Sequence, residues 1–281
     1  MHPTGLHTGL VGRSIQASRS PWLHEQEARA QGLALTYSLF DFTARGLDDD
    51  ALGPLLRELA ATGYRGVNIT YPFKQQVIPL LDALDETARS VGAVNTVAML
   101  EGVLTGYNTD MSGFRESLVE GLPDRRQDRV LQLGAGGAGA AVAHALLSAG
   151  AGVVEIADMD LARAEALCAT LVARHGAGRA VARPLAGLDL AAIDGVVNAT
   201  PMGMAANPAP PLDPALLARR HWVVDIVYFP LETELLRAAR ARGCRVLDGS
   251  GMVIAQAAAA FAIFLGRPAD KARMRASFAA A

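Results

Sequence analysis

The chain has 281 residues, of which 51% are hydrophobic and 19% are charged, and its formal net charge at pH 7 is −2. A chain of this length and composition can bury a substantial core, and its length alone favours two domains. The near balance of charge, without a long basic or acidic run, argues against nucleic acid or an anionic membrane surface as the main partner.

The sequence also argues against a membrane or secreted protein. No hydrophobic run approaches the roughly 20 residues that a membrane span needs, and no charged N-terminal region precedes a hydrophobic signal core. We therefore expect a cytoplasmic protein. The cysteines, Cys168 and Cys244, are far apart and should be small buried side chains. His24 has no second histidine or acid at metal-ligand spacing, so we expect a packed helical residue and no metal site.

The first part of the chain alternates strand-like and helix-like segments. Strands are expected at residues 9–12, 36–40 and 66–70, and helices from Pro21 to about Ala30, around 50–62 and from Lys74 onward. Pro21 suits an early helical position, where its missing N–H is not needed. Such alternation predicts an α/β fold with a mostly parallel, doubly wound sheet.

The second part predicts another parallel sheet of Rossmann type. Strands are expected at 130–133, 153–157, 195–198 and 223–227, and helices at 112–120, 138–149, 252–265 and 269–279. Residues 121–128 are the expected linker. We expect a substrate-binding domain at 1–121, a dinucleotide-binding domain at 122–247, and C-terminal helices at 248–281 that return to the first domain and leave a cleft between the two.

A glycine-rich turn follows the first strand of this second sheet. Gly134, Gly136 and Gly139 have the spacing G-x-G-x-x-G between a hydrophobic strand and an alanine-rich helix. The first glycine allows a tight turn, the second lets a pyrophosphate approach the backbone, and the third lets the helix pack closely. The motif alone also fits a plain strand-turn-helix, but its context predicts a dinucleotide site. Its residues are Gly134, Ala135, Gly136, Gly137, Ala138 and Gly139.

Asp158 ends the next strand and refines the cofactor prediction. A carboxylate there can accept hydrogen bonds from both adenosine ribose hydroxyls, and it would repel the 2′-phosphate of NADP. NAD is therefore favoured over NADP. Two alternatives stay open: Asp158 could cap the helix that begins near Asp160, or Arg163 could offset the repulsion.

Four polar clusters are expected where strands of the first domain end, and open α/β sheets bind ligands at strand ends. They are residues 18–21, 68–74, 92–96 and 108–110. Their hydroxyls, amides, ammonium and carboxylate suit a small polyhydroxylated acid as the partner.

Structural alternatives exist for several of these polar residues. Ser18 and Ser20 could cap the helix after Pro21, and Asp110 could cap the helix at 111–120. Asn95 could satisfy strand-end backbone groups.

The motifs together resemble the shikimate dehydrogenase family. The resemblance rests on motifs in the family's order over nearly the whole chain: Ser18-x-Ser20-Pro21, Asn68-x-Thr70-x-Pro72-x-Lys74, Gly92-Ala93-Val94-Asn95-Thr96, Asn108-Thr109-Asp110-x-x-Gly113, the glycine turn, Asn198-Ala199-Thr200-Pro201-Met202-Gly203-Met204, Asp225-x-x-Tyr228-x-Pro230 and Asp248-Gly249-x-x-Met252 with Gln256.

This resemblance implies an oxidoreductase that interconverts shikimate and 3-dehydroshikimate by hydride transfer to a nicotinamide. It implies Lys74 and Asp110 as the catalytic pair. The implied substrate ligands are Ser18, Ser20, Thr70, Asn95 and Gln256, with Tyr228 bordering both substrate and nicotinamide. Further residues expected beside the cofactor are Thr200, Met202 and Gly249.

One departure from the NADP-using biosynthetic enzymes sharpens the cofactor prediction. Those enzymes typically carry Asn-Arg-Thr after the second nucleotide-domain strand, with the arginine gripping the 2′-phosphate, whereas this chain has Ala157-Asp158-Met159. The exchange resembles NAD-using quinate/shikimate dehydrogenases. Those often have threonine in place of Ser20, and one methyl contributes only about 1 to 3 kcal/mol of discrimination, so quinate and shikimate both stay open.

The chemical role of Lys74 and the function of the chain keep alternatives. Because an ordinary lysine is almost entirely protonated near neutral pH, Lys74 is either a desolvated base oriented by Asp110 or a cation that stabilises the developing alkoxide. Alternative functions are a dehydrogenase of an aminoshikimate-like ring acid and a non-catalytic NAD-binding regulator. The preferred acid, the physiological direction and a homodimeric assembly stay open.

Overall fold

The computed structural model describes residues 5–280. It divides the chain into two compact units, which we call unit 1 (up to Thr109, and again from Ile254) and unit 2 (Asp110–Val253). The C-terminal residues thus return to unit 1. The divisions differ from the expected ones at 121/122 and 247/248, because each connection is a continuous helix: α4 (Thr109–Gly121) and α8 (Ser250–Leu265) both contain residues of the two units.

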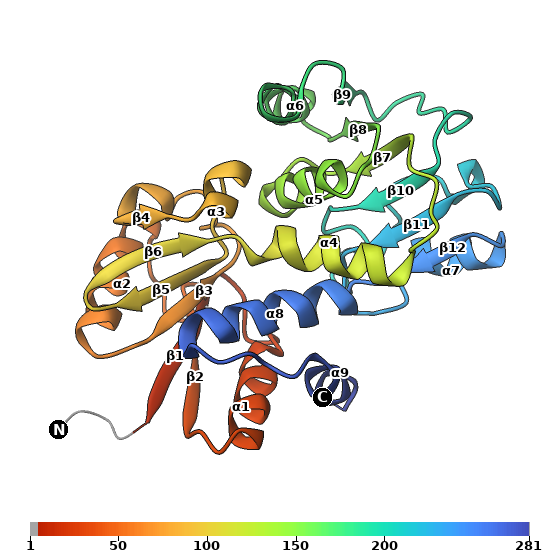
Figure 1. Cartoon of the computed structure of the whole chain (residues 1–281). Helices are drawn as coiled ribbons and strands as arrows, with labels where there is room; N and C mark the ends of the chain where they lie inside the picture. The colour runs from red at the N-terminus through yellow and green to blue at the C-terminus, as the bar shows by residue number, and fades with distance from the viewer. Residues whose placement is uncertain (1–4, 281) are drawn as a thin grey trace. The chain divides into compact units, whose positions relative to one another are not determined.

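Unit 1 is built on a mixed six-stranded sheet (Figure 1). The strands are, in spatial order, β2 (Leu35–Asp41), β1 (Leu6–Gly12), β3 (Gly66–Ile69), β5 (Thr96–Leu100), β6 (Val103–Tyr107) and β4 (Ala83–Leu84). The pairs β1–β2, β1–β3 and β4–β6 are parallel, whereas β5 is antiparallel to both neighbours. The expected strands at 9–12, 36–40 and 66–70 are confirmed.

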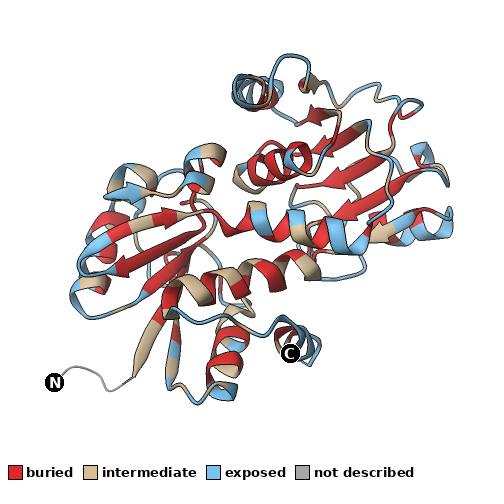
Figure 2. Ribbon diagram, in the orientation of Figure 1, coloured by how far each residue is buried: buried red, intermediate tan, exposed pale blue. Residues whose placement is uncertain are grey.

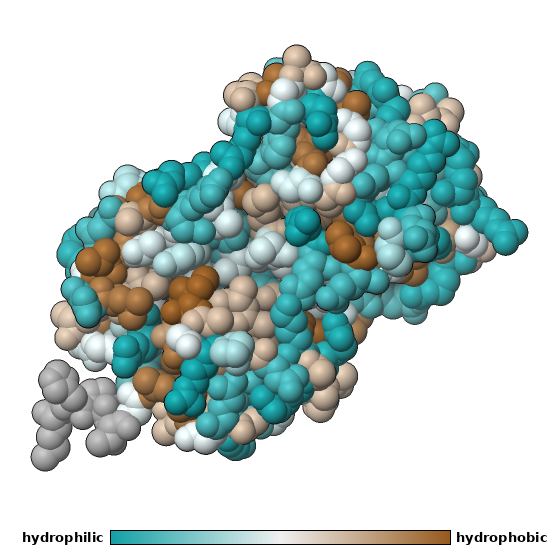
Figure 3. Space-filling model, in the orientation of Figure 1, coloured by the Kyte–Doolittle hydropathy of each residue, from teal (hydrophilic) through white to brown (hydrophobic). Residues whose placement is uncertain are grey.

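The sequence pattern did not predict the β5–β6 hairpin. Its two strands join through Glu101 and Gly102, both with positive φ (51° and 80°), a backbone conformation typical of tight turns. Leu100 and Val103 flank this turn with 45% and 47% of their surface exposed, and Figure 3 shows hydrophobic surface over this part of unit 1.

Several helices belong to unit 1, and the last of them packs on the first. They are α1 (Ser20–Ala30), α2 (Leu52–Ala61), α3 (Glu86–Val91), the larger part of α8, and α9 (Lys271–Ala279). In α1, His24 is buried against Tyr37 of β2, with ring centroids 4.8 Å apart, which confirms the expected packed helical histidine. Glu27 of α1 is buried and accepts hydrogen bonds from Arg273 of α9 (Nε to Oε2, 2.7 Å), so α9 is fastened to α1.

The helix expected from Lys74 onward is wrong. Residues 71–77 form successive turns, followed by a single 3-10 turn at Ile78–Leu80. Pro79 explains the difference, because proline lacks a backbone donor and clashes with the preceding turn of an α-helix.

Unit 2 holds a fully parallel six-stranded sheet (Figure 1). Its spatial order is β12 (Arg245–Leu247), β11 (Trp222–Asp225), β10 (Gly195–Asn198), β7 (Arg129–Leu133), β8 (Val153–Ala157) and β9 (Ala180–Arg183). The expected strands at 130–133, 153–157 and 195–198 are confirmed, and the fourth ends earlier, at Asp225. Because the chain runs outward from β7 in both directions, the order reverses there, and such reversals bind ligands in open α/β sheets.

The other helices of this unit are α5 (Gly137–Ser148), α6 (Leu161–His175) and α7 (Glu234–Ala241), in addition to most of α4. Figure 2 shows the strands of this sheet mostly buried, and nine residues of α5 are buried as well. The thiols of Cys168 and Cys244 are buried and free, as expected.

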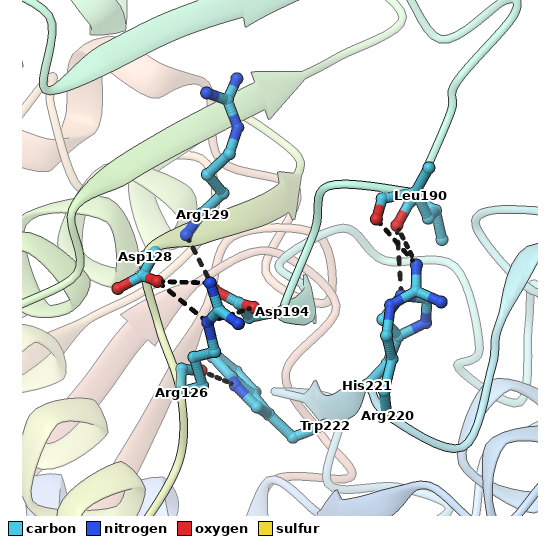
Figure 4. Close-up of polar contacts among 9 residues, drawn as sticks. Arg126, Asp128, Arg129, Leu190, Asp194, Arg220, His221 and Trp222 are labelled. Carbon is cyan, nitrogen blue, oxygen red and sulfur yellow. Dashed lines mark hydrogen bonds and ion pairs between the residues drawn. The ribbon is translucent and has the colours of Figure 1, made fainter.

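The amino ends of the unit 2 strands are joined by polar contacts (Figure 4). Arg126 donates from Nε to Asp128 Oδ2 (2.9 Å) and pairs with Asp194 (3.3 Å), while Asp194 accepts the backbone N–H of Arg129 (3.1 Å). The indole Nε1 of buried Trp222 donates to the Arg126 carbonyl at 2.7 Å. Trp222 is therefore structural. Among residues 5–280, no helix has the length and apolar character to cross a membrane.

Candidate functional site

Two turns of unit 1 leave the carboxyl ends of adjacent strands side by side. β1 and β3 are parallel, with Val11 opposite Ile69, and the Thr70 N–H donates to the Val11 carbonyl (3.0 Å). A Cβ added at Gly12 would lie 2.4 Å from Thr70 Cγ2, so only glycine allows this approach. The segments that follow β1 and β3 are thus side by side where they leave the sheet, and the Arg13 N–H donates to the Tyr71 carbonyl (3.0 Å).

The serine turn is shaped by a residue that the sequence reasoning missed, Asp41 at the end of β2. Its buried carboxylate accepts the N–H groups of Ser14 (2.9 Å) and Ile15 (3.0 Å) and the side-chain amide of Gln16 (3.0 Å). Burial acts to raise the pKa of Asp41, but these hydrogen bonds outweigh it and hold the pKa below its ordinary value. An ionised Asp41 therefore fixes the chain that leads to Ser18.

The two serines are not a simple helix cap. Helix α1 has Arg19 as its N-cap residue, so Ser20 lies inside the first turn, and Ser18 Oγ accepts the Ser20 N–H at 3.3 Å. Neither serine is therefore at the N-cap position, although Ser18 accepts the N–H of the first helical residue. Arg19 points to α9, where Nη1 donates to the Phe278 carbonyl (3.3 Å) and the guanidinium lies 5.3 Å from the Phe278 ring centroid. The C-terminal helix therefore anchors the serine turn.

A buried polar network connects the strand ends of unit 1 to the start of α4. Asn95 accepts the N–H of Thr109 on Oδ1 (2.8 Å) and donates from Nδ2 to Thr109 Oγ1 (2.9 Å). Asn68 donates to Thr96 Oγ1 (2.9 Å) and accepts from the Tyr37 hydroxyl (2.8 Å). Asn95 thus does what its structural alternative predicts, and in doing so it positions the residue immediately before Asp110.

The expected catalytic residues follow two of these elements. Lys74 is half-buried in the turn after β3, and its carbonyl accepts the Val94 N–H at 2.7 Å, which joins the lysine turn to the segment that contains Asn95. Asp110 is buried (6% exposed). Because α4 begins at Thr109, Asp110 lies in the first helical turn. A carboxylate there interacts favourably with the helix dipole.

The glycine turn of unit 2 has the form that a dinucleotide requires. Gly134 has φ +101°, and a Cβ there would lie 2.7 Å from the Ala199 carbonyl oxygen; one at Gly139 would lie 2.4 Å from the Gly134 oxygen. At Gly136, by contrast, a Cβ would have open space for 4 Å around it in the part of the chain that the structure describes, neighbours in sequence apart. The turn is therefore closely packed at Gly134 and Gly139 and has open space at Gly136. Because this open space lies at the amino end of α5, it suits a pyrophosphate.

Asp158 is held against this turn. Its Oδ2 accepts the N–H of Ala135 (2.7 Å) and its Oδ1 accepts the N–H of Asp160 (2.9 Å). The cap of α6 is Asp160, whose side chain accepts the Arg163 N–H (3.3 Å), so the alternative that Asp158 caps this helix is wrong.

The loops that contain Thr200, Met202 and Tyr228 are tied to two buried residues at the ends of β10 and β11. Asn198 donates to the Met202 carbonyl and to Asp225 Oδ1 (both 2.9 Å) and accepts from Thr200 Oγ1 (2.7 Å). Burial raises the pKa of Asp225, against the opposing hydrogen bonds from Thr233, Val227 and Asn198.

Gly249 lies beneath these loops, where a Cβ would approach the Ile226 carbonyl oxygen to 2.5 Å. Tyr228 is 40% exposed. The sequence signal for Asn198 and Asp225 was present in the motifs, but their bracing role required the structure.

The predicted site residues are therefore divided between the two units. Unit 1 contains Ser18, Ser20, Thr70, Lys74, Asn95 and the half-buried Gln256 of α8, and unit 2 contains Asp110, Tyr228 and the residues expected to hold a dinucleotide. An open groove of about 390 Å³, lined by Leu6, Arg65 and Phe264 among others, lies at the amino ends of β1 and β3, opposite the edge with the serine turn.

Two family models match parts of this chain. A family model described as the shikimate dehydrogenase substrate binding domain matches residues 10–97, and one described as the shikimate 5′-dehydrogenase C-terminal domain matches residues 249–277. The two ranges contain the expected substrate ligands from Ser18 to Asn95, and Gln256.

Similar proteins differ in the cofactor that their names state. The shikimate dehydrogenase (NADP(+)) of Arthrobacter sp. strain FB24 is 49% identical over 96% of this chain and 93% of its own length. The quinate/shikimate dehydrogenase (NAD(+)) of Corynebacterium glutamicum strain R is 46% identical over 96% of each chain. A solved structure of quinate dehydrogenase from C. glutamicum in complex with NAD is 46% identical, covers 99% of both chains and superimposes with a TM-score of 0.93.

Proposed function

This chain belongs to the shikimate dehydrogenase family, and we propose that it oxidises shikimate, and quinate as a second substrate, with NAD rather than NADP as the preferred hydride acceptor. Overall identity does not decide the cofactor, because relatives of similar identity are named for NADP(+) and for NAD(+).

The observation that carries the proposal is the position of Asp158. An ionised carboxylate offers about four acceptor positions, and the backbone N–H groups of Ala135 and Asp160 take two of them. The remaining positions suit the two ribose hydroxyls of NAD. The 2′-phosphate of NADP carries a charge of about −1.5 to −2 and would meet this carboxylate directly. Arg163 is the cation nearest to Asp158 in sequence. Its Nη2 lies 3.8 Å from Asp160 Oδ2, so the Asp160 carboxylate already offsets part of the positive charge that Arg163 could offer to a 2′-phosphate.

We assign the chemistry of the substrate to unit 1 and the first residues of α4. The Ser18 and Ser20 hydroxyls would hold the carboxylate, and Thr70, Asn95 and Gln256 the ring hydroxyls. Lys74, with Asp110, would act on the hydroxyl that is oxidised, either by taking its proton or by stabilising the alkoxide while the proton leaves through Asp110 or water. A bound nicotinamide would supply the hydride acceptor.

Steady-state kinetics test the proposal. Reduction of NAD and of NADP is followed at the absorbance of the reduced nicotinamide, with shikimate, quinate and an amino analogue of shikimate. We expect kcat/KM with NAD to exceed that with NADP by at least about tenfold, which corresponds to about 1.4 kcal/mol of differential binding. An equal or higher kcat/KM with NADP would contradict the proposal, and tight NAD binding without turnover of any acid would indicate a regulator.

A variant of Asp158 tests the assignment itself. Asp158→Asn keeps the shape of the side chain and removes its charge, so kcat/KM with NADP should rise while that with NAD falls. The matched control is Glu165→Gln, which removes a carboxylate charge from the exposed surface of α6, away from the glycine turn and from the pair of Arg163 and Asp160. A cofactor ratio that does not move in Asp158→Asn would show that another residue sets the preference.

A further inference from the structure

Gln132 is a polar residue near the carboxyl end of a mostly hydrophobic strand, and its side chain is fully buried (0% exposed). It precedes the glycine turn by two residues, on β7, at the point where the strand order of unit 2 reverses. A buried amide in such a strand costs stability unless its hydrogen-bonding groups are used.

The amide of Gln132 connects the two ends of the glycine turn. Nε2 donates to the carbonyl of Gly134, which opens the turn, and to the carbonyl of Gly139, which closes it, both at 2.8 Å. Rotating the amide by half a turn would set Oε1 against two carbonyl oxygens, so the hydrogen bonds fix its orientation. Within residues 5–280, Oε1 is buried and has no hydrogen-bond partner.

The buried, unpaired Oε1 lowers the stability of the fold, whereas the two hydrogen bonds from Nε2 hold the glycine turn in one shape. A leucine or methionine at this position would bury no unsatisfied acceptor, so the strand's packing alone would favour a hydrophobic residue. The polar side chain is explained by the two carbonyls that it holds at a set separation.

Gly139 is the counterpart of Gln132. A Cβ at Gly139 would lie 3.2 Å from Gln132 Nε2 as well as 2.4 Å from the Gly134 oxygen. The third glycine of the motif therefore makes room for the amide in addition to letting the helix pack. Asp158 holds the same turn from its other side, through the N–H of Ala135.

We propose that Gln132 is a positioning residue that holds the glycine turn in its pyrophosphate-binding shape before the dinucleotide arrives. A preformed turn spares the cofactor the cost of ordering it, so Gln132 acts on the affinity for the pyrophosphate and not on the affinity for the adenosine or the substrate. This inference rests on the proposed function only in that a dinucleotide binds at the glycine turn.

The test compares binding of three ligands, NAD, ADP and adenosine, to the full-length chain by isothermal titration calorimetry. Gln132→Met keeps the length of the side chain and removes both donors, and Gln132→Leu is a second hydrophobic variant in case the first does not fold. The matched control is Val196→Ala, which opens a cavity in the adjacent strand β10, opposite Leu131, without touching the turn. Thermal unfolding reports the stability of each variant.

The expected result is a rise of about tenfold in the Kd of NAD and ADP for Gln132→Met, equivalent to about 1.4 kcal/mol, with the Kd of adenosine changed less than about twofold. The KM for shikimate should not change. In the ligand-free protein, hydrogen exchange at residues 134–140 should quicken in Gln132→Met and not in Val196→Ala. The control should lower the melting temperature while all three Kd values stay the same.

The proposal is overturned if Gln132→Met binds NAD and ADP as tightly as the parent chain, or if it weakens adenosine as much as ADP. Because these measurements need no turnover, a chain that binds NAD but oxidises no ring acid would refute the proposed function and leave this test intact. If the parent chain oxidises shikimate and Gln132→Met binds NAD with an unchanged Kd, the proposed function is supported and the positioning role of Gln132 is refuted.

Discussion

The two units stabilise their ligand-binding turns in different ways. In unit 2, the bracing residues Gln132, Asn198 and Asp225 are fully buried at the carboxyl ends of the strands that precede the loops they hold. In unit 1, the serine turn is held by residues from distant parts of the chain, Asp41 on β2 and Phe278 on α9. The dinucleotide half therefore depends on neighbouring strands of one sheet, and the substrate half depends on long-range contacts.

This difference predicts that the two halves can be damaged separately. Variants in unit 1 should change the chemistry or the KM for the acid without changing the affinity for NAD. Variants of the bracing residues of unit 2 should weaken the binding of NAD without changing the KM for the acid.

The largest expected effect is that of Lys74→Met. Removing the ammonium group should lower kcat by about 10²- to 10⁴-fold, the range for loss of a general acid or base, while the Kd of NAD stays constant. Rapid kinetics with shikimate and calorimetry with NAD measure the two quantities. Lys271→Met, at the start of α9, is the matched control because it removes the chain's other lysine. A near-normal kcat in Lys74→Met would remove Lys74 from the mechanism.

The next effect is the loss of unit 1 stability in acid through His24. Burial lowers the pKa of His24 from 6.5 to about 3, so the folded chain keeps it neutral while the unfolded chain takes up a proton. The contribution of neutral His24 to the free energy of unfolding is therefore fully present above pH 6.5. As the pH falls from 6.5 toward about 3, the free energy of unfolding decreases by up to about 5 kcal/mol.

Chemical denaturation of the parent chain and of His24→Phe at pH 7 and pH 4.5 measures this term. The variant should lose less free energy of unfolding between the two pH values.

In unit 2, burial, together with the charges of His175 and Arg174, lowers the pKa of His144 to about 4, so His144→Phe should show a similar but smaller difference. The same pH dependence in His24→Phe as in the parent chain would contradict the assignment.

A smaller effect is expected from Glu27→Gln, which tests how far α9 supports unit 1. Glu27 Oε1 accepts from Arg273 Nη2 (2.8 Å) and from the Asp270 N–H (2.9 Å). Removing the charge should lower the free energy of unfolding by about 1 to 3 kcal/mol, because charge-assisted hydrogen bonds are lost in a buried place. The exposed Glu58→Gln on α2 is the control. If the Kd of NAD changed as much as the stability, the two units would not be separable.

The smallest effect is expected from Arg19→Ala. Loss of the contacts with Phe278 should loosen the serine turn and raise the KM for shikimate by about two- to tenfold, with kcat and the KM for NAD nearly unchanged. Arg29→Ala, at the exposed end of α1, controls for the loss of positive charge. A variant with an unaltered KM would show that α9 does not support this turn.

The sequence identified most strands, the glycine turn and Asp158, because each is encoded by a short run of residues. Hydrophobic runs predicted β1, β7, β8 and β10, and the spacing of Gly134, Gly136 and Gly139 reflects contacts within one turn. The family resemblance added the polar residues of unit 1, on motifs that are contiguous in the chain.

Only the tertiary structure showed what holds those residues in place. Gln132 looked like part of a hydrophobic strand, Asn95 and Thr109 are joined across β5 and β6, and Arg19 reaches a helix at the other end of the chain. Local periodicity reports which face of a strand or helix is buried, whereas a hydrogen bond between segments far apart in sequence depends on how those segments pack. For that reason the sequence by itself determined most of the core strands and the glycine turn, and the packing of distant segments determined the β5–β6 hairpin and which side chains support the turns.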